Sequence, residues 1–155
     1  MKLSIVALGH KMPAWVAAGY AEYAGRLPRD WPLDLVELKP EPRDRGRSVP
    51  QLLATEAKRL DAACADATVV ALDEAGSPWT TRELATRLER WRASTQALAF
   101  VIGSADGLDA GFKRRAAARF SLSSLTLPHA LVRVMLAEQI YRAASLIAGH
   151  PYHRD

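Results

Sequence analysis

The chain has 155 residues, 49% of them hydrophobic, so it carries enough apolar surface for one compact domain and is not expected to be disordered. A net charge of +4 permits a nucleic-acid partner but does not require one. Cys64 is the single cysteine, which excludes an internal disulfide and a multi-cysteine zinc site, and we expect it to be a small buried group on a helix. Residues 2–8 are too short for a secretory signal and charged residues interrupt the apolar stretch 131–147, so we expect no membrane span and a cytoplasmic protein.

Strand and helix signals alternate along the chain. Continuous β-prone runs predict strands, and apolar side chains at helical spacing between turn signals predict helices. In chain order, the expected elements are a strand over 2–8, a helix over 13–27, a strand over 33–38, a helix after Ser48, a strand over 68–72, a helix after Thr80, a strand over 97–102, a short helix, a brief strand over 120–122 and a helix over 131–147.

The starts of two helices carry specific signals. Ser48 can cap the helix after the Pro-rich loop 39–49, and residues 80–83 form a capping-box pattern. Residues 75–78 are expected to break the chain after the third strand. The helix after Ser48 is expected to place Glu56 at the solvent edge of a buried stripe made of Leu52, Leu53, Ala57, Leu60 and Cys64.

Strands that lack polar alternation and are separated by helices indicate a parallel sheet covered on both faces. We therefore expect an α/β fold in which residues 1–155 form one domain. In open α/β sheets, ligands bind at the carboxyl ends of the strands. Loops with functional potential follow three of the expected strands: residues 72–74, residues 103–107 with Gly103 and Gly107 at its ends, and residues 122–127.

The loop 122–127 suggests the kind of ligand. Its small hydroxyl residues and leucines suit an adenine or another flat, mostly apolar group, whereas a phosphate would favour Lys, Arg or a glycine-rich nest. The sequence contains neither a Gly-x-Gly-x-x-Gly fingerprint nor a Walker-type Gly-Lys-Ser/Thr. Pro128 then sets His129 at the mouth of the expected site. The residues of this loop are Leu122, Ser123, Ser124, Leu125, Thr126 and Leu127.

Charged and aromatic residues gather in three other places. Two basic clusters could contact phosphates or could be solvated faces; they are Lys39, Arg43, Arg45 and Arg47, and Lys113, Arg114, Arg115 and Arg119. In the C-terminal tail, Tyr152, His153 and Arg154 combine a stacking ring, a proton-exchanging group and a hydrogen-bond donor to a base or phosphate. The alternative is a tail that packs on the core through Tyr152. Pro151 separates His150 from His153 and no carboxylate joins them locally, so we expect no metal site.

The sequence resembles a known protein family. It is similar to the bacterial enzymes that methylate N3 of a pseudouridine in large-subunit ribosomal RNA, which belong to the SPOUT class of knotted methyltransferases. The similarity extends over the whole chain. The residues that carry it are the loop 122–129, Leu131-Val132-Arg133-Val134, the stretch 138–142, His150-Pro151-Tyr152-His153-Arg154, Lys11-Met12-Pro13 with Trp15, Leu72-Asp73 with Gly76, Pro78-Trp79, Leu88-Glu89-Arg90-Trp91 and Ile102-Gly103.

The resemblance implies a deep trefoil knot in the C-terminal part, an exception to the rule that chains do not thread loops. It implies that S-adenosyl-L-methionine binds in the knot against Leu72, Gly103, Gly107 and the loop 122–127. It also implies a homodimer with the long C-terminal helix at its interface, acting on ribosomal RNA in assembled ribosomes. One departure concerns the loop after Ile102, which in the family usually reads Gly-Gly-Pro-Glu-Gly and here reads Gly103-Ser104-Ala105-Asp106-Gly107.

The hypothesis for catalysis follows from the reaction. The imide N3 of pseudouridine must lose a proton as it attacks the methyl group, and negative charge develops on the flanking carbonyls. His129 or His153 could accept the proton. Arg142, oriented by Glu138, could donate to the base or a phosphate, as could Arg154, and Tyr152 could stack on the target. The alternatives are a non-catalytic ribosome-binding or RNA-binding module of the same fold, and a knotted methyltransferase acting on transfer RNA.

Overall fold

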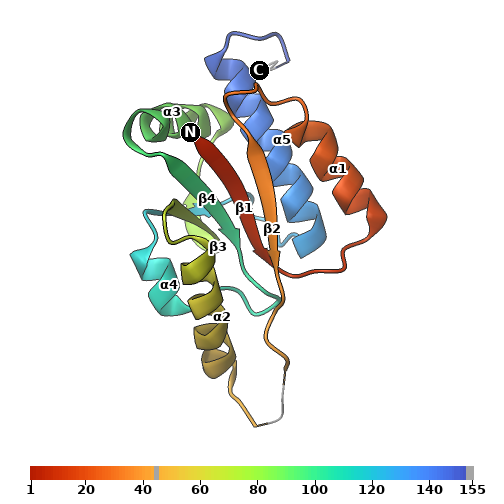
Figure 1. The fold of residues 1–155 in the computed structure, drawn as a ribbon, viewed down its shortest axis with the longest axis vertical. Helices are drawn as coiled ribbons and strands as arrows, with labels where there is room; N and C mark the ends of the chain where they lie inside the picture. Colours follow the sequence, from red (N-terminus) through yellow and green to blue (C-terminus); the bar gives the residue numbers. More distant parts are fainter. Residues whose placement is uncertain (44–45, 153–155) are drawn as a thin grey trace.

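The computed structural model describes residues 1–43 and 46–152, and Figure 1 shows one sheet with helices on both of its faces. The strands of this described part are β1 (Lys2–Leu8), β2 (Leu33–Leu38), β3 (Thr68–Pro78), β4 (Ala97–Ile102) and β5 (Ala118–Ser121). The helices are α1 (Ala14–Ala24), α2 (Val49–Ala63), α3 (Thr81–Ser94), α4 (Ala110–Arg115) and α5 (His129–Ile147).

The sheet has the strand order β2-β1-β4-β3-β5, and each neighbouring pair is parallel. Helices α1, α3 and α5 cover one face, with α5 in contact with both of the others, and α2 and α4 cover the other face (Figure 1). The prediction of an α/β fold with a parallel sheet covered on both faces is therefore confirmed. Among the described residues, we find no helix long and apolar enough to cross a membrane.

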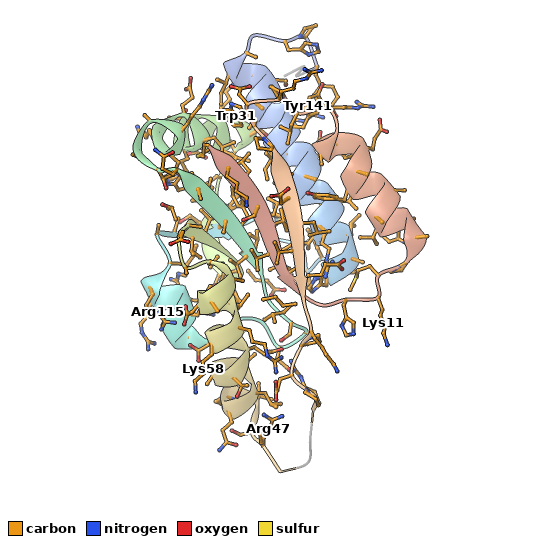
Figure 2. All side chains as sticks on the ribbon, viewed as in Figure 1. Lys11, Trp31, Arg47, Lys58, Arg115 and Tyr141 are labelled. Carbon is orange, nitrogen blue, oxygen red and sulfur yellow. The ribbon has the colours of Figure 1, made fainter. Side chains whose placement is uncertain are left out.

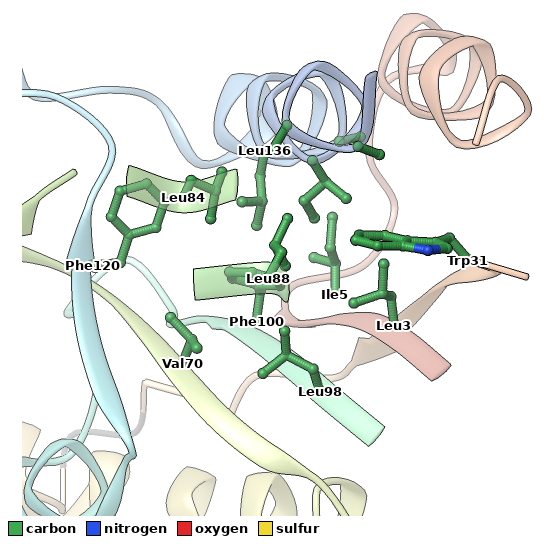
Figure 3. Close-up of a cluster of buried hydrophobic side chains, with 14 of the residues drawn as sticks. Leu3, Ile5, Trp31, Val70, Leu84, Leu88, Leu98, Phe100, Phe120 and Leu136 are labelled. Atoms are coloured by element: carbon green, nitrogen blue, oxygen red, sulfur yellow. The ribbon is translucent and has the colours of Figure 1, made fainter. Parts of the chain in front are cut away.

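Burial on both faces explains why β4 and most of β1 are apolar. In β1, Leu3 and Ile5 point toward α5 and α3, whereas Val6 points toward α2, because successive strand residues alternate between faces. Figure 3 shows the larger core on the first face, where Leu136 of α5 lies over Ile5 and Phe100. This packing fixes α5 against the strands whose carboxyl ends form the site described below.

Both predicted helix caps are confirmed. Ser48 and Gln51 form a capping box at the start of α2, and Thr80 and Glu83 form another at the start of α3. Each satisfies backbone N–H groups that a helix start would otherwise leave unpaired. Cys64 is buried, as expected, and it is the C-cap residue directly after α2.

The expected chain break at 75–78 is wrong. Strand β3 continues to Pro78, and Ser77 pairs with Phe120 after a register shift that begins at Leu72. The bulge lets Gly76 lie against β5, where a Cβ on Gly76 would come within 2.8 Å of the backbone of Arg119 and Phe120. Turn-forming residues here serve a bulge, because pairing with β5 supplies the hydrogen bonds that a turn would otherwise provide.

The expected position of Glu56 at the solvent edge of α2 is also wrong, because Glu56 is 1% exposed. Its carboxylate accepts hydrogen bonds from the Ser104 hydroxyl and the Glu41 backbone N–H, and it pairs with Arg43. A buried carboxylate is tolerated when such partners replace water. Those partners come from segments distant in sequence, which the spacing of α2 could not reveal.

Candidate active site

The predicted loops meet around one cavity of about 590 Å³, beside the bulge of β3 and at the carboxyl ends of β4 and β5. The β3 bulge contributes residues 72–74, and the loop after β4 contributes residues 103–108. The end of β5 and the segment after it contribute residues 120–123 and 125–127. Ser124 lies outside the lining, while the rest of the loop 122–127 belongs to it. His129 and Val132, from the first turn of α5, close the remaining side. The sequence therefore predicted which loops line this cavity. The rule behind the prediction, that ligands bind at the carboxyl ends of the strands, applies to open α/β sheets in general.

The loop 103–107 needs both of its glycines. A Cβ on Gly103 would lie 2.5 Å from the carbonyl oxygen of Gly107, which real structures do not allow. Gly107 itself has φ of +85°, in the region that favours glycine. The Gly107 N–H donates to the Ser104 carbonyl at 2.9 Å, which closes the turn. The loop is thus a tight turn whose outer residues face the cavity.

The loop 122–127 is ordered by its own serines. The Ser121 hydroxyl donates to the carbonyl of Ser123, and the Ser123 hydroxyl accepts from the Leu125 N–H at 2.9 Å. Leu125 remains 71% exposed on the cavity wall, which is unusual for a large apolar side chain. Because the hydroxyls bond to the loop itself, the wall presents mainly apolar and backbone groups, which suits a flat, weakly polar ligand.

Asp73 supplies a charged group at the other side of the cavity. Its Oδ1 accepts from the Ala75 N–H, whereas its buried Oδ2 has no hydrogen-bond partner among the described residues. Lys113 and Arg119 lie 3.5 and 3.6 Å from that oxygen and balance its charge. These two cations compensate the buried carboxylate oxygen, and Asp73 contributes to the lining of the cavity.

The two basic clusters are engaged in ion pairs within the chain. The pairs are Arg43–Glu56, Arg43–Asp106, Arg47–Glu41, Arg115–Asp61, Lys113–Asp73 and Arg119–Asp73. Arg45 lies outside the described residues. These pairs offset part of the positive charge that could otherwise contact phosphates.

His129 is held in one protonation state by its neighbours. Its Nε2 lies 3.1 Å from Nη2 of Arg133, and a guanidinium can only donate, so Nε2 must be the accepting nitrogen of a neutral ring. Burial and the charge of Arg133 both lower the pKa of His129, and a hydrogen bond with the Gly103 backbone opposes them. The ring therefore bridges α5 and the loop after β4.

Arg133 is the site residue that sequence reasoning missed. It is fully buried, and it donates through Nη1 to Glu37 at 2.6 Å and through Nη2 to the Gly9 carbonyl at 2.7 Å. These contacts join the start of α5 to the ends of β1 and β2. The available signal was an arginine one helical turn after His129 in an otherwise apolar stretch.

Arg142 and Tyr152 meet beside the second half of α5. Oε1 of Glu138 accepts from Nε of Arg142 at 2.8 Å and from the Tyr152 hydroxyl at 3.1 Å. The Arg142 guanidinium lies 4.9 Å from the centre of the Tyr152 ring, and Tyr141 contacts the same ring at 4.5 Å. Hydrogen bonding with Glu138 raises the pKa of Arg142, so this guanidinium stays charged. His153 lies outside the described residues, and so does Arg154.

The cavity and this cluster are separate within one chain. His129 begins α5, and Glu138, which the Tyr152 hydroxyl contacts, follows nine residues later, about 14 Å along the helix at 1.5 Å per residue. Figure 2 shows Tyr141, which also contacts Tyr152, near the end of the molecule opposite Arg47. The structure brings together the predicted cavity residues, and separately Arg142 with Tyr152, but it does not join the two groups.

Comparison with known proteins agrees with this architecture. A family model described as "Predicted SPOUT methyltransferase" matches residues 1–153. The chain belongs to the SPOUT methyltransferase family. The predicted membership in this class is thereby confirmed, and so is the prediction that the protein is a methyltransferase.

Relatives match this SPOUT chain along its whole length. Proteins named "Ribosomal RNA large subunit methyltransferase H" from Paraburkholderia phymatum and Burkholderia thailandensis are 52% and 53% identical to it, each over 155 residues and 99% of both chains. Among solved structures, a probable methylase family protein from Haemophilus influenzae superposes with a TM-score of 0.62 at 14% identity, covering 99% of this chain and 70% of that one. At that identity the superposition supports the fold alone.

Proposed function

We propose that this protein is an S-adenosyl-L-methionine-dependent methyltransferase that modifies N3 of a pseudouridine in large-subunit ribosomal RNA, on assembled ribosomes in the cytoplasm. The observation that carries the proposal is that the predicted loops line one cavity in a chain that matches, end to end, relatives named for ribosomal RNA methylation. The family membership supports methyl transfer, and the names of the relatives support the RNA substrate.

The cavity has properties that fit the cofactor. Its volume lies in the range of about 300–1,000 Å³ that small-molecule sites usually have. The uncharged loop 122–127 suits an adenine. When bound, the cofactor supplies an electrophilic methyl group on a sulfonium. The residues that would hold it are Leu72, Gly103, Gly107, Leu122, Ser123, Leu125, Thr126 and Leu127, within a C-terminal trefoil knot.

The RNA-binding half of the site is proposed to come from a second protomer. Within one chain Tyr152 contacts Glu138 and Arg142 and does not line the cavity. No residue of α5 is fully exposed even in the single chain, and its half-buried apolar side chains suit a helix at a dimer interface. A homodimer would let the tail of one protomer face the cavity of the other.

The residues divide the chemistry as follows. Tyr152 stacks on the target base, while Arg142 and Arg154 donate hydrogen bonds to its carbonyls or to phosphates. The Nε2 lone pair of His129 already accepts from Arg133, so the proton of N3 is assigned to His153 of the tail, and His129 lines the cavity as a neutral ring. Glu138 accepts hydrogen bonds from both Tyr152 and Arg142 and so fixes their positions relative to each other.

The test is methyl transfer from radiolabelled cofactor to assembled ribosomes, separated subunits, naked ribosomal RNA and transfer RNA. We expect label in large-subunit RNA of assembled ribosomes, lost when the target uridine has not been isomerised to pseudouridine. Tyr152→Ala should abolish transfer while cofactor binding, measured by calorimetry, persists. Label in transfer RNA would favour the tRNA enzyme, and ribosome binding without label would favour the non-catalytic module.

A further inference from the structure

The loop 103–107 is tied to the segment before α2. Nε of Arg43 donates to Oδ2 of Asp106 at 3.1 Å, and Nη2 of Arg43 donates to the Ser104 hydroxyl at 2.8 Å. Ser104 and Asp106 are among the positions at which this loop departs from the usual family sequence. The side chains that replace a glycine and a longer acid therefore make contacts that a Gly-Gly-Pro-Glu-Gly loop could not make in the same way.

Glu56 of α2 contacts both Ser104 and Arg43. It is 1% exposed, and its Oε1 accepts from the Ser104 hydroxyl at 2.9 Å. Its Oε2 accepts from the Glu41 N–H at 3.1 Å and from Nη1 of Arg43 at 3.3 Å. Removing a carboxylate from water costs free energy unless such partners compensate it. The buried carboxylate of Glu56 therefore favours the conformation in which Ser104, Glu41 and Arg43 all contact it. It takes no part in the proposed chemistry.

The contacts made by Arg43 and Glu56 reach residues that line the cavity. Gly103, Ser104 and Asp106 all line it, and the turn that carries them is closed by the bond from the Gly107 N–H to the Ser104 carbonyl. Alanine at 105 gives a less constrained backbone than proline, whereas serine at 104 is more constrained than glycine. The side-chain contacts of Arg43 and Glu56 supply the constraint that proline would otherwise provide.

We propose that Glu56 and Arg43 are positioning residues that fix the loop 103–107 for ligand binding in the cavity. They act through Ser104 and Asp106 and do not touch the ligand. The identity of that ligand rests on the proposed function, whereas the fixing of the loop does not. Because Arg43 and Asp106 are partly exposed, salt screens their pairing, and the fit of the cavity should therefore depend on ionic strength.

The test uses the full-length protein and two variants. Glu56→Gln keeps an acceptor for Ser104 but loses the charge that pairs with Arg43, and Arg43→Ala removes the donors to Ser104 and Asp106. We expect each to weaken binding of S-adenosylhomocysteine by about tenfold in calorimetry, as for loss of a charged hydrogen bond. We also expect faster hydrogen exchange of the Gly107 amide without ligand. The matched control is Arg92→Ala, which removes an exposed arginine paired with Asp30 elsewhere.

The outcomes separate this inference from the proposed function. Wild-type affinity and exchange in both variants would overturn the positioning role and leave the methyltransferase proposal intact. Faster exchange with unchanged affinity would also overturn it, because the shape of the loop would then not govern binding. If the wild-type protein does not bind S-adenosylhomocysteine, the proposed cofactor is wrong, and the Gly107 exchange rates still decide whether Glu56 and Arg43 fix the loop.

Discussion

Arg133 carries a full charge with no exposed surface, and its contacts explain why this is tolerated. Glu37 compensates the charge, the Gly9 carbonyl and His129 accept further hydrogen bonds, and the Nε atom has no partner among the described residues. Replacing water with these groups joins α5 to the ends of β1 and β2. It also fixes the tautomer of His129 at the edge of the cavity, so a buried arginine determines how a neighbouring ring can act.

Stability should depend on pH through His129. Its pKa is lowered in the folded protein, so below about pH 6.5 the unfolded chain takes up a proton that the folded chain resists. The contribution of His129 to the free energy of unfolding is therefore present above that pH and is lost as pH falls through the folded pKa. We predict that His129→Gln, whose amide oxygen can still accept from Arg133, flattens this dependence in urea titrations from pH 5 to 8.

The control for this experiment is His10→Gln, which has none of the contacts of His129 with Arg133 in the described structure. It should keep the wild-type pH profile. A wild-type profile in His129→Gln would instead mean that other groups govern the pH dependence and that the ring is not held neutral.

At the scale of elements, the bulge in β3 determines how closely β5 can approach. Gly76→Ala places a Cβ within 2.8 Å of the β5 backbone, and backbone atoms cannot move aside as the end of a side chain can. We predict a loss of about 1–3 kcal/mol in the free energy of unfolding, measured by urea denaturation. Because β5 leads into the loop 122–127, ligand affinity should fall as well.

Gly46→Ala is the matched control, because a Cβ there meets nothing within 4 Å. It should leave both quantities close to wild type. Equal effects of the two substitutions would show that close contact between β3 and β5 does not limit stability.

The elements also show how far the sequence could predict the structure. Apolar runs located β1 and β4, alternation of apolar and polar residues located β2, and capping patterns located the starts of α2 and α3, since these signals are local. The extension of β3 was missed because its Gly-Ser-Pro sequence is typical of a turn and its pairing partner lies elsewhere. Arg133 and Glu56 were missed for the same reason: Glu37, for example, is 96 residues from Arg133.

At the scale of the whole molecule, the cavity and the cluster around Tyr152 use different parts of α5, and complementation between protomers should follow. Leu125→Arg places a charge on the cavity wall, and Tyr152→Ala removes the stacking ring, so each protein alone should be inactive. Mixed by unfolding and refolding, they should form heterodimers with one intact composite site. We predict recovery of about a quarter of wild-type methyl transfer, the value for random pairing of protomers.

Each variant refolded alone serves as the control and should remain inactive. If light scattering and mass spectrometry show heterodimers but no methyl transfer returns, the tail and cavity do not act across protomers. Activity of Tyr152→Ala alone would mean that the ring is structural.

The strand order has a consequence for protein synthesis. Strand β5 lies at the edge of the sheet beside β3, and it is followed by the segment that completes the cavity wall. A nascent polypeptide can pair β1 with β2 and β4 before that segment leaves the exit tunnel, yet it has no closed pocket at that stage. Truncated translation products that end before Ala118 would keep those pairings and be unable to compete for the methyl donor.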